Sequence, residues 1–220
     1  MLFSLLSLCV MRQASAACKP HVITFGKTMS VKWYAESDET SRIDLKVRPL
    51  YVDARLKEYT SGSPHDITDR LLVVQRAFRF NDNLPQEPAS APRWRWQRGG
   101  WLLVDRLTGR VSPVNLPDFD PLYSTASWYR DYIAYCGISD DGRRIFAVVA
   151  QLGRRKAVVK RPLASSPATE MPDSACTSPN WQRQPVRVTF EPTQGDKITF
   201  SVRGHVADVI NDTEEEEGSE

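Results

Sequence analysis

Apolar and polar side chains alternate with a period of two along several segments of this 220-residue chain. Ile43, Leu45 and Val47 alternate with polar neighbours, and the segment 186–190 repeats the pattern. A period of two places every second side chain on one face of a strand, whereas an amphipathic helix needs a period of about 3.6. The alternation therefore predicts a mainly β protein, built as an antiparallel sandwich or barrel or from partial propeller-like sheets.

Glycine-containing turns divide the alternating segments into predicted hairpins. Gly99-Gly100 is expected to form a two-residue turn between the strand that carries Trp94 and Trp96 and the strand that begins at Trp101. A second hairpin is predicted over 186–202, and residues 52–60 are predicted to be a turn or a short helix. A further strand is predicted to place four apolar side chains on one face: Leu72, Val74, Phe78 and Phe80.

Composition divides the chain into five predicted regions. These are a signal peptide at 1–17, a β-rich domain at 18–161, a loop or linker rich in Pro, Ser and Thr at 162–184, a C-terminal β-hairpin at 185–205 packed on the main domain, and a disordered acidic tail at 206–220. The chain is basic apart from its acidic C-terminal end. Residues 19–211 hold 28 basic and 21 acidic side chains, a net charge of +7.

The first residues predict export. A short apolar run over 1–11 precedes Ala14-Ser15-Ala16, which fits the small residues of a signal peptidase site. Arg12 follows the run and no positive charge precedes it, so a buried N-terminal helix or strand is the alternative. The leucine usually found three places before a lipid-modified cysteine is missing, so we do not expect a lipid anchor at Cys18. The predicted location is secreted or periplasmic.

Three cysteines remain after the predicted cleavage, which allows one disulfide and one free thiol. We favour a bond between Cys136, in a predicted core strand, and Cys176, in a loop that the bond would tie down. Three buried free thiols are the alternative. The chain has no C-x-x-C pair, and its three histidines lie far apart along the sequence at His21, His65 and His205, so neither a metal site nor a cofactor is expected.

Residues 101–161 resemble blades of the WD40 or TolB type of β-propeller. A strand ends at Asp105 and turns at Thr108-Gly109, and the sequence Ser139-Asp-Asp-Gly142 separates two further strands. In such turns Asp and Ser accept backbone hydrogen bonds while Gly adopts a positive φ. The resemblance implies antiparallel hairpins. A complete propeller would need about four blades of roughly forty residues, nearly the whole mature chain, and no clean repeat of that period is present.

Acidic pairs are the candidates for catalysis that occur in number. They are Asp118 and Asp120, Asp131 beside Arg130, and Asp140 with Asp141. Paired acids serve in glycoside hydrolysis when their surroundings separate their pKa values. Asp before Pro or Gly is, however, an ordinary turn residue, and this interpretation is favoured. The sequence lacks a G-x-S-x-G elbow and a phosphate-binding glycine loop, so an enzyme is the less favoured hypothesis.

An aromatic and basic segment is the predicted binding site. Arg93, Trp94, Arg95 and Trp96 alternate, and Trp101 follows across the predicted turn. If the tryptophans are exposed they offer a flat surface for sugar rings, and if they are buried they belong to the core, the commoner fate.

The preferred functional hypothesis is an exported, non-catalytic β-rich module that binds or supports another component of the cell envelope. Its expected partner is a cell-envelope glycan or another envelope protein, and nucleic acid is not an expected partner. The alternatives are an envelope glycan hydrolase that uses an Asp pair, and a polyanion-binding protein. The polyanion contacts would be basic side chains: Arg93, Arg95, Arg98, Arg143, Arg144, Arg154, Arg155 and Lys156.

Overall fold

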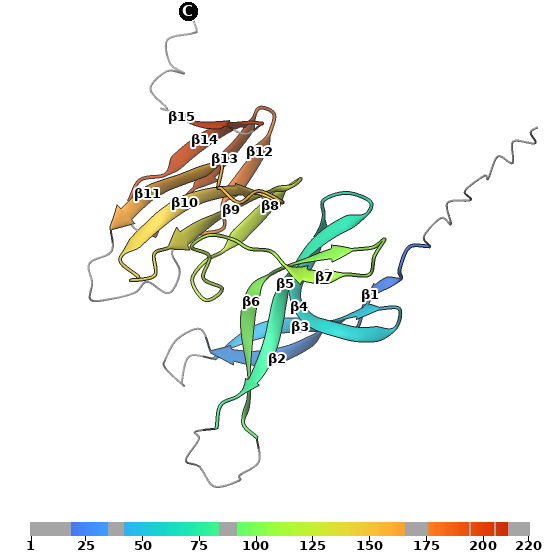
Figure 1. Ribbon diagram of the computed structural model, residues 1–220. Coiled ribbons are helices and arrows are strands. Elements are labelled where there is room, and N and C mark those ends of the chain that lie inside the picture. The colour runs from blue at the N-terminus through green and yellow to red at the C-terminus, as the bar shows by residue number, and fades with distance from the viewer. Residues whose placement is uncertain are drawn as a thin grey trace, which may run out of the picture.

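The computed structural model describes residues 19–34, 42–83, 92–165, 176–193, 195–204 and 206–210. All regular structure in these ranges is β, as predicted (Figure 1). The N-terminal strands are β1 (Ile23–Phe25), β2 (Met29–Tyr34), β3 (Arg42–Val52), β4 (Arg55–Asp66), β5 (Leu71–Asn81), β6 (Trp94–Asp105) and β7 (Val111–Pro113). They are followed by β8 (Ala126–Tyr129), β9 (Tyr132–Ile138), β10 (Arg144–Gln151), β11 (Val159–Ser165), β12 (Asn180–Arg183), β13 (Val186–Phe190), β14 (Ile198–Arg203) and β15 (Val206–Ile210).

Strands β2 to β6 pair in a ring. Each strand pairs antiparallel with the next, and β6 returns to pair parallel with β2 through Trp33 and Trp96. A meander with an odd number of strands can close only through such a parallel pair. The ring is a small barrel. Where it closes, β2 has β3 and β6 as neighbours, and β6 has β5 and β2.

The connection between β3 and β4 is a two-residue turn. Asp53 and Ala54 have φ values of 49° and 61°, and Val52 pairs with Arg55 across them. Two successive positive φ values are the geometry that matches the twist of a tight hairpin. Of the two predictions for 52–60, the turn is therefore present, and strand β4 takes the place of the short helix.

A bulge between β5 and β6 corrects the predicted turn at Gly99-Gly100. Gln75 pairs with Trp101 and Ala77 with Arg98, so Gly99 and Gly100 lie opposite one residue inside a continuous β6 and form no turn. Neither glycine has the positive φ that a two-residue hairpin needs. The extra residue lies in β6, so Leu72, Val74, Phe78 and Phe80 stay on one face of β5, as predicted, and differ in how far that face is covered. Leu72 and Val74 are buried, whereas Phe78 is half-buried and Phe80 is exposed.

The C-terminal half is a sandwich of two four-stranded antiparallel sheets. One has the order β11-β10-β9-β8 and the other β12-β13-β14-β15, and they lie face to face in Figure 1. Their shared core includes Cys136, Val149, Val188, Phe190 and Phe200, all fully buried. The hairpin predicted over 186–202 is the centre of the second sheet.

A disulfide joins Cys136 of β9 to Cys176, which lies before β12, with 6.0 Å between their Cα atoms. This is the pairing favoured from the sequence. Both residues are buried in the core between the two sheets. The bond therefore connects the two layers of the sandwich across their shared core.

The second face of the β8–β11 sheet packs against the barrel and the connection from β7 to β8. Trp101 of β6, together with Leu116 and Phe119 of the connection, covers Tyr135 and Phe146 on this face. The Tyr135 hydroxyl donates to the Pro117 carbonyl at 2.7 Å, and burial raises the pKa of this phenol. The sheet is thus covered on both sides.

Several predicted boundaries differ from the structure. β11 extends into the predicted linker at 162–184, β12 lies within it, and residues 206–210 of the predicted tail form β15, which pairs with β14. The blade-like stretch at 101–161 divides between the barrel and the first sandwich sheet, and the described strands form no ring of blades. The predicted signal peptide, Cys18, His205 and the acidic run after residue 210 lie outside the described residues.

No helix in the described part of the chain has the length and apolar character needed to cross a membrane.

Candidate binding site

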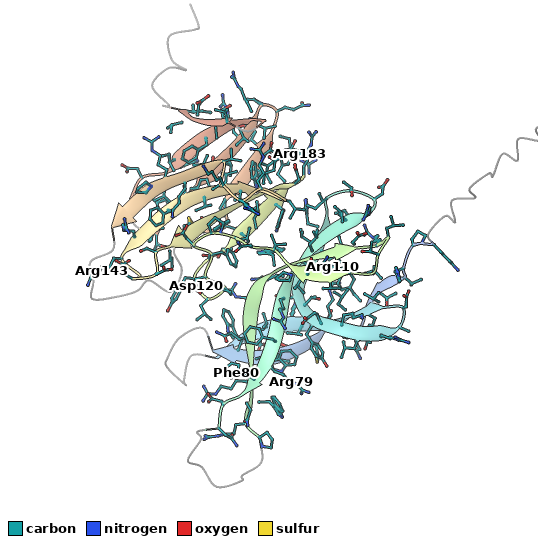
Figure 2. The ribbon with its side chains drawn as sticks, in the orientation of Figure 1. Arg79, Phe80, Arg110, Asp120, Arg143 and Arg183 are labelled. Carbon is teal, nitrogen blue, oxygen red and sulfur yellow. A yellow bond between two sulfur atoms is a disulfide. The ribbon has the colours of Figure 1, made fainter. Side chains whose placement is uncertain are left out.

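The end of the β5–β6 hairpin carries exposed aromatic and basic side chains. We name Arg79, Phe80, Trp94 and Arg95 the hairpin tip, and Figure 2 labels Arg79 and Phe80 there. Trp94 is 53% exposed and Phe80 38% exposed. Most large apolar side chains in the described part of the chain are at least partly buried, so two exposed rings at the end of one hairpin mark a candidate contact region.

The antiparallel register distributes the hairpin tip over two faces. Arg95 pairs with Phe80 on one face, and Arg79 pairs with Trp96 on the other. The Arg79 guanidinium carbon lies 4.9 Å from the centre of the Trp94 ring, a cation–π contact. Arg95 forms an ion pair with Asp82. Each face of the hairpin end therefore presents one aromatic ring beside one arginine.

The other predicted tryptophans belong to the interior. Trp96 meets the Tyr59 ring edge-on, 5.1 Å between centres, inside the barrel. Trp101 meets Trp128 of β8 at 5.4 Å, in the seam between barrel and sandwich. Of the three tryptophans predicted to offer a flat binding surface, only Trp94 is thus exposed. Sequence reasoning missed Arg79, which the β5–β6 register places beside Trp94, and Phe80, which lies on the opposite face of the hairpin.

Arg98 was predicted as a polyanion contact, but its side chain is bound to other parts of the protein. Its guanidinium carbon lies 4.3 Å from the centre of the Trp33 ring, and its Nη2 donates to the Leu122 carbonyl at 3.0 Å. Burial lowers the pKa of Arg98, and the charge of Asp120 partly offsets that effect. The side chain fastens the β7–β8 connection to the barrel and is not available to a ligand.

The remaining predicted basic cluster is divided between two places. Arg143 and Arg144 lie at one end of β10, and the residues 154–156 follow its other end. Eight residues of strand separate them by about 25 Å at roughly 3.3 Å per residue. The five cations therefore form no single patch.

Four predicted acids meet in one hollow of about 590 Å³. Asp118 and Asp120 come from the β7–β8 connection and Asp140 and Asp141 from the β9–β10 turn, and Figure 2 labels Asp120 at this place. Leu116, Phe119 and Tyr123 supply its apolar lining. Asp131 lies apart and accepts a hydrogen bond from Gln151 at 2.8 Å.

Three of the four acids of the hollow have structural partners. Lys160 pairs with Asp118 at 2.8 Å, and Asp120 accepts the Leu122 amide at 2.7 Å. The Ser139 hydroxyl donates to Asp141, and this bond is the main reason why the pKa of Asp141 lies below its ordinary value. The bonds of Asp120 and Asp141 are the turn-capping roles favoured from the sequence. No group of three His, Cys, Asp or Glu side chains in the described ranges is placed to hold a metal ion.

No protein-family model matches the chain, and neither a curated protein nor a solved structure matches it.

Proposed function

We propose that the protein is an exported, non-catalytic binding module of the cell envelope that engages an anionic glycan through the hairpin tip. The observation that carries the proposal is the half-exposed indole of Trp94 with the Arg79 guanidinium beside it. The disulfide between Cys136 and Cys176 supports an oxidising compartment, because such bonds are rare in reducing ones.

The aromatic rings supply the part of the interaction that depends on shape. An indole offers a rigid apolar face on which the C–H side of a sugar ring can stack, at a small cost in side-chain entropy. Leaving Trp94 in water forfeits the hydrophobic free energy that burying it in a complex would release. A ligand that covers the indole at the hairpin tip would release this hydrophobic free energy.

The arginines supply the part that depends on charge. A guanidinium binds carboxylate, sulfate or phosphate groups through paired N–H donors. Arg79 contacts the Trp94 ring. No carboxylate in the described part of the chain forms an ion pair with it. Arg79 can therefore meet an acidic group of a sugar that stacks on the neighbouring indole.

The alternative of a glycan hydrolase would place catalysis in the acid-lined hollow. Its favouring observation is that two predicted Asp pairs line the same wall of the molecule. Asp118 is neutralised by Lys160, and Asp120 and Asp141 accept bonds that hold their own turns. We therefore prefer binding to hydrolysis.

Affinity electrophoresis tests the proposal, with dextran sulfate as the anionic glycan and uncharged dextran as its reference. We expect dextran sulfate to retard the wild-type chain and Trp94→Ala to weaken this affinity about tenfold, because the stacked ring is lost. Arg79→Gln should weaken it similarly and reduce its dependence on salt.

Two variants serve as matched controls. Leu56→Ala removes another exposed apolar side chain, and Arg110→Gln removes another exposed arginine, which Figure 2 shows away from the hairpin tip. Both should bind as the wild type does. Equal affinities of all four variants would contradict the proposal, and equal retardation by uncharged dextran would contradict its anionic part.

A further inference from the structure

A second surface of the barrel, on the side of β2, β3 and β4, carries converging donors for an oxyanion. Thr28, Lys46, Arg48, Gly62 and Ser63 line a hollow of about 230 Å³, which we name the Lys46–Arg48 hollow. Its lining therefore holds two cations and two hydroxyl groups. None of these lining residues, all within the described ranges, is acidic.

The wall of the hollow is formed by an irregularity in β4. Ser61 pairs with Gln75 and His65 with Val73, so residues 62–64 stand opposite a single residue of β5. Gly62 has a φ of 70°, and a side chain at this position would meet open space. The bulge moves the Gly62-Ser63 backbone out of the sheet and opens the hollow beside β3.

The Arg48 guanidinium is held in place before any ligand arrives. Its carbon lies 4.4 Å from the centre of the Phe25 ring, and its Nη2 donates to the Gly62 carbonyl at 2.9 Å. A guanidinium has five N–H donors, so this bond leaves others. Holding the cation fixed lowers the entropic cost of binding an anion.

Among the described residues, no carboxylate neutralises the charge of the hollow. Lys46 and Arg48 form no ion pair with any described carboxylate, whereas the nearby Lys32 is paired with Asp44. Two adjacent cations without a counter-charge repel each other, and a bound anion relieves that repulsion.

We propose that the Lys46–Arg48 hollow is a binding site for an oxyanion of the phosphate or sulfate class. Arg48 and Lys46 supply the positive charge, and the hydroxyls of Thr28 and Ser63 supply neutral donors. The ligand is either the free ion or its ester on a sugar, since both present the same tetrahedral oxygens. The site lies on different strands from the hairpin tip and does not depend on it.

The test is an NMR titration of the full chain with inorganic phosphate, and separately with glucose 6-phosphate, following the amide resonances of Gly62 and Ser63. We expect saturable shifts of both resonances. Lys46→Gln should weaken the affinity at least about tenfold, because a charged hydrogen bond is lost. Lys57→Gln, which removes an exposed lysine elsewhere on β4, should leave the affinity within about twofold.

The outcomes separate the two ligand sources and the two proposals. Saturation by inorganic phosphate assigns the free ion, and saturation by glucose 6-phosphate alone assigns the ester. Absence of saturation with either probe, or equal weakening by Lys46→Gln and Lys57→Gln, overturns the site. Trp94→Ala should not alter these shifts, so failure at the hairpin tip and failure here are distinguishable.

Discussion

Reduction of the Cys136–Cys176 disulfide should destabilise the sandwich strongly. The two residues are 40 positions apart in sequence. In the chain-entropy account, cross-linking a loop of that length disfavours the unfolded state by about 4 kcal/mol at 25 °C. With a urea dependence of about 2.5 kcal/mol/M, the unfolding midpoint should fall by about 1.5 M. Tryptophan fluorescence follows the transition, since Trp181 packs against the sandwich core.

A matched variant isolates the effect of the bond. Cys136→Ala/Cys176→Ala lacks the disulfide, so adding reductant should not lower its midpoint further. The variant should be at least as unstable as the reduced wild type, because both side chains are buried and their removal leaves cavities. Oxidised and reduced wild-type chains that unfold within about 0.3 M urea of each other would refute the reasoning.

Three further changes test other parts of the structure. Gly137→Ala should destabilise the first sandwich sheet by about 1 to 3 kcal/mol in urea unfolding, because a Cβ there would lie 3.1 Å from the Asp118 carbonyl oxygen. The hydrogen bond from Arg70 holds the pKa of Asp105 below its ordinary value, so its stabilisation is present above pH about 4 and is lost as the pH falls further. Thermal unfolding of Asp105→Asn should accordingly show a deficit at pH 7 that narrows below pH about 4. Trp96→Ala should cost about 3 to 5 kcal/mol and Trp94→Ala less than about 0.5 kcal/mol, measured by urea unfolding, because only Trp96 packs in the barrel core.

Local turn chemistry was predictable where one side chain and one glycine determine it. Ser139 and Asp141 bond to each other and Gly142 has a φ of 69°, as the Ser-x-Asp-Gly pattern predicts. The hairpin between Val186 and Val202, predicted from alternation on both sides of a short glycine-containing turn, is also present. These features depend on neighbours within a few residues, so the sequence contains the information that fixes them.

Closure of the barrel and the two-layer sandwich could not be predicted in the same way. The barrel closes through Trp33 and Trp96, residues far apart in sequence that reveal no mutual preference. Alternation shows that a strand has a buried face, but it does not show which other strand covers that face. Sandwich, barrel and propeller-like sheets therefore all fitted the pattern, and the structure contains the first two.

The positions of the bulges could not be predicted from the alternation, and one of the two proposed surfaces lies at a bulge. Alternation is counted on the assumption of an unbroken register, and one extra residue exchanges the inner and outer faces beyond it. The bulge at Gly99 and Gly100 places Trp101 on the same face of β6 as Trp96, although the two residues are five positions apart. The bulge in β4 places Gly62 and Ser63 in the wall of the Lys46–Arg48 hollow. The irregular register therefore decides which side chains of these two strands share a surface.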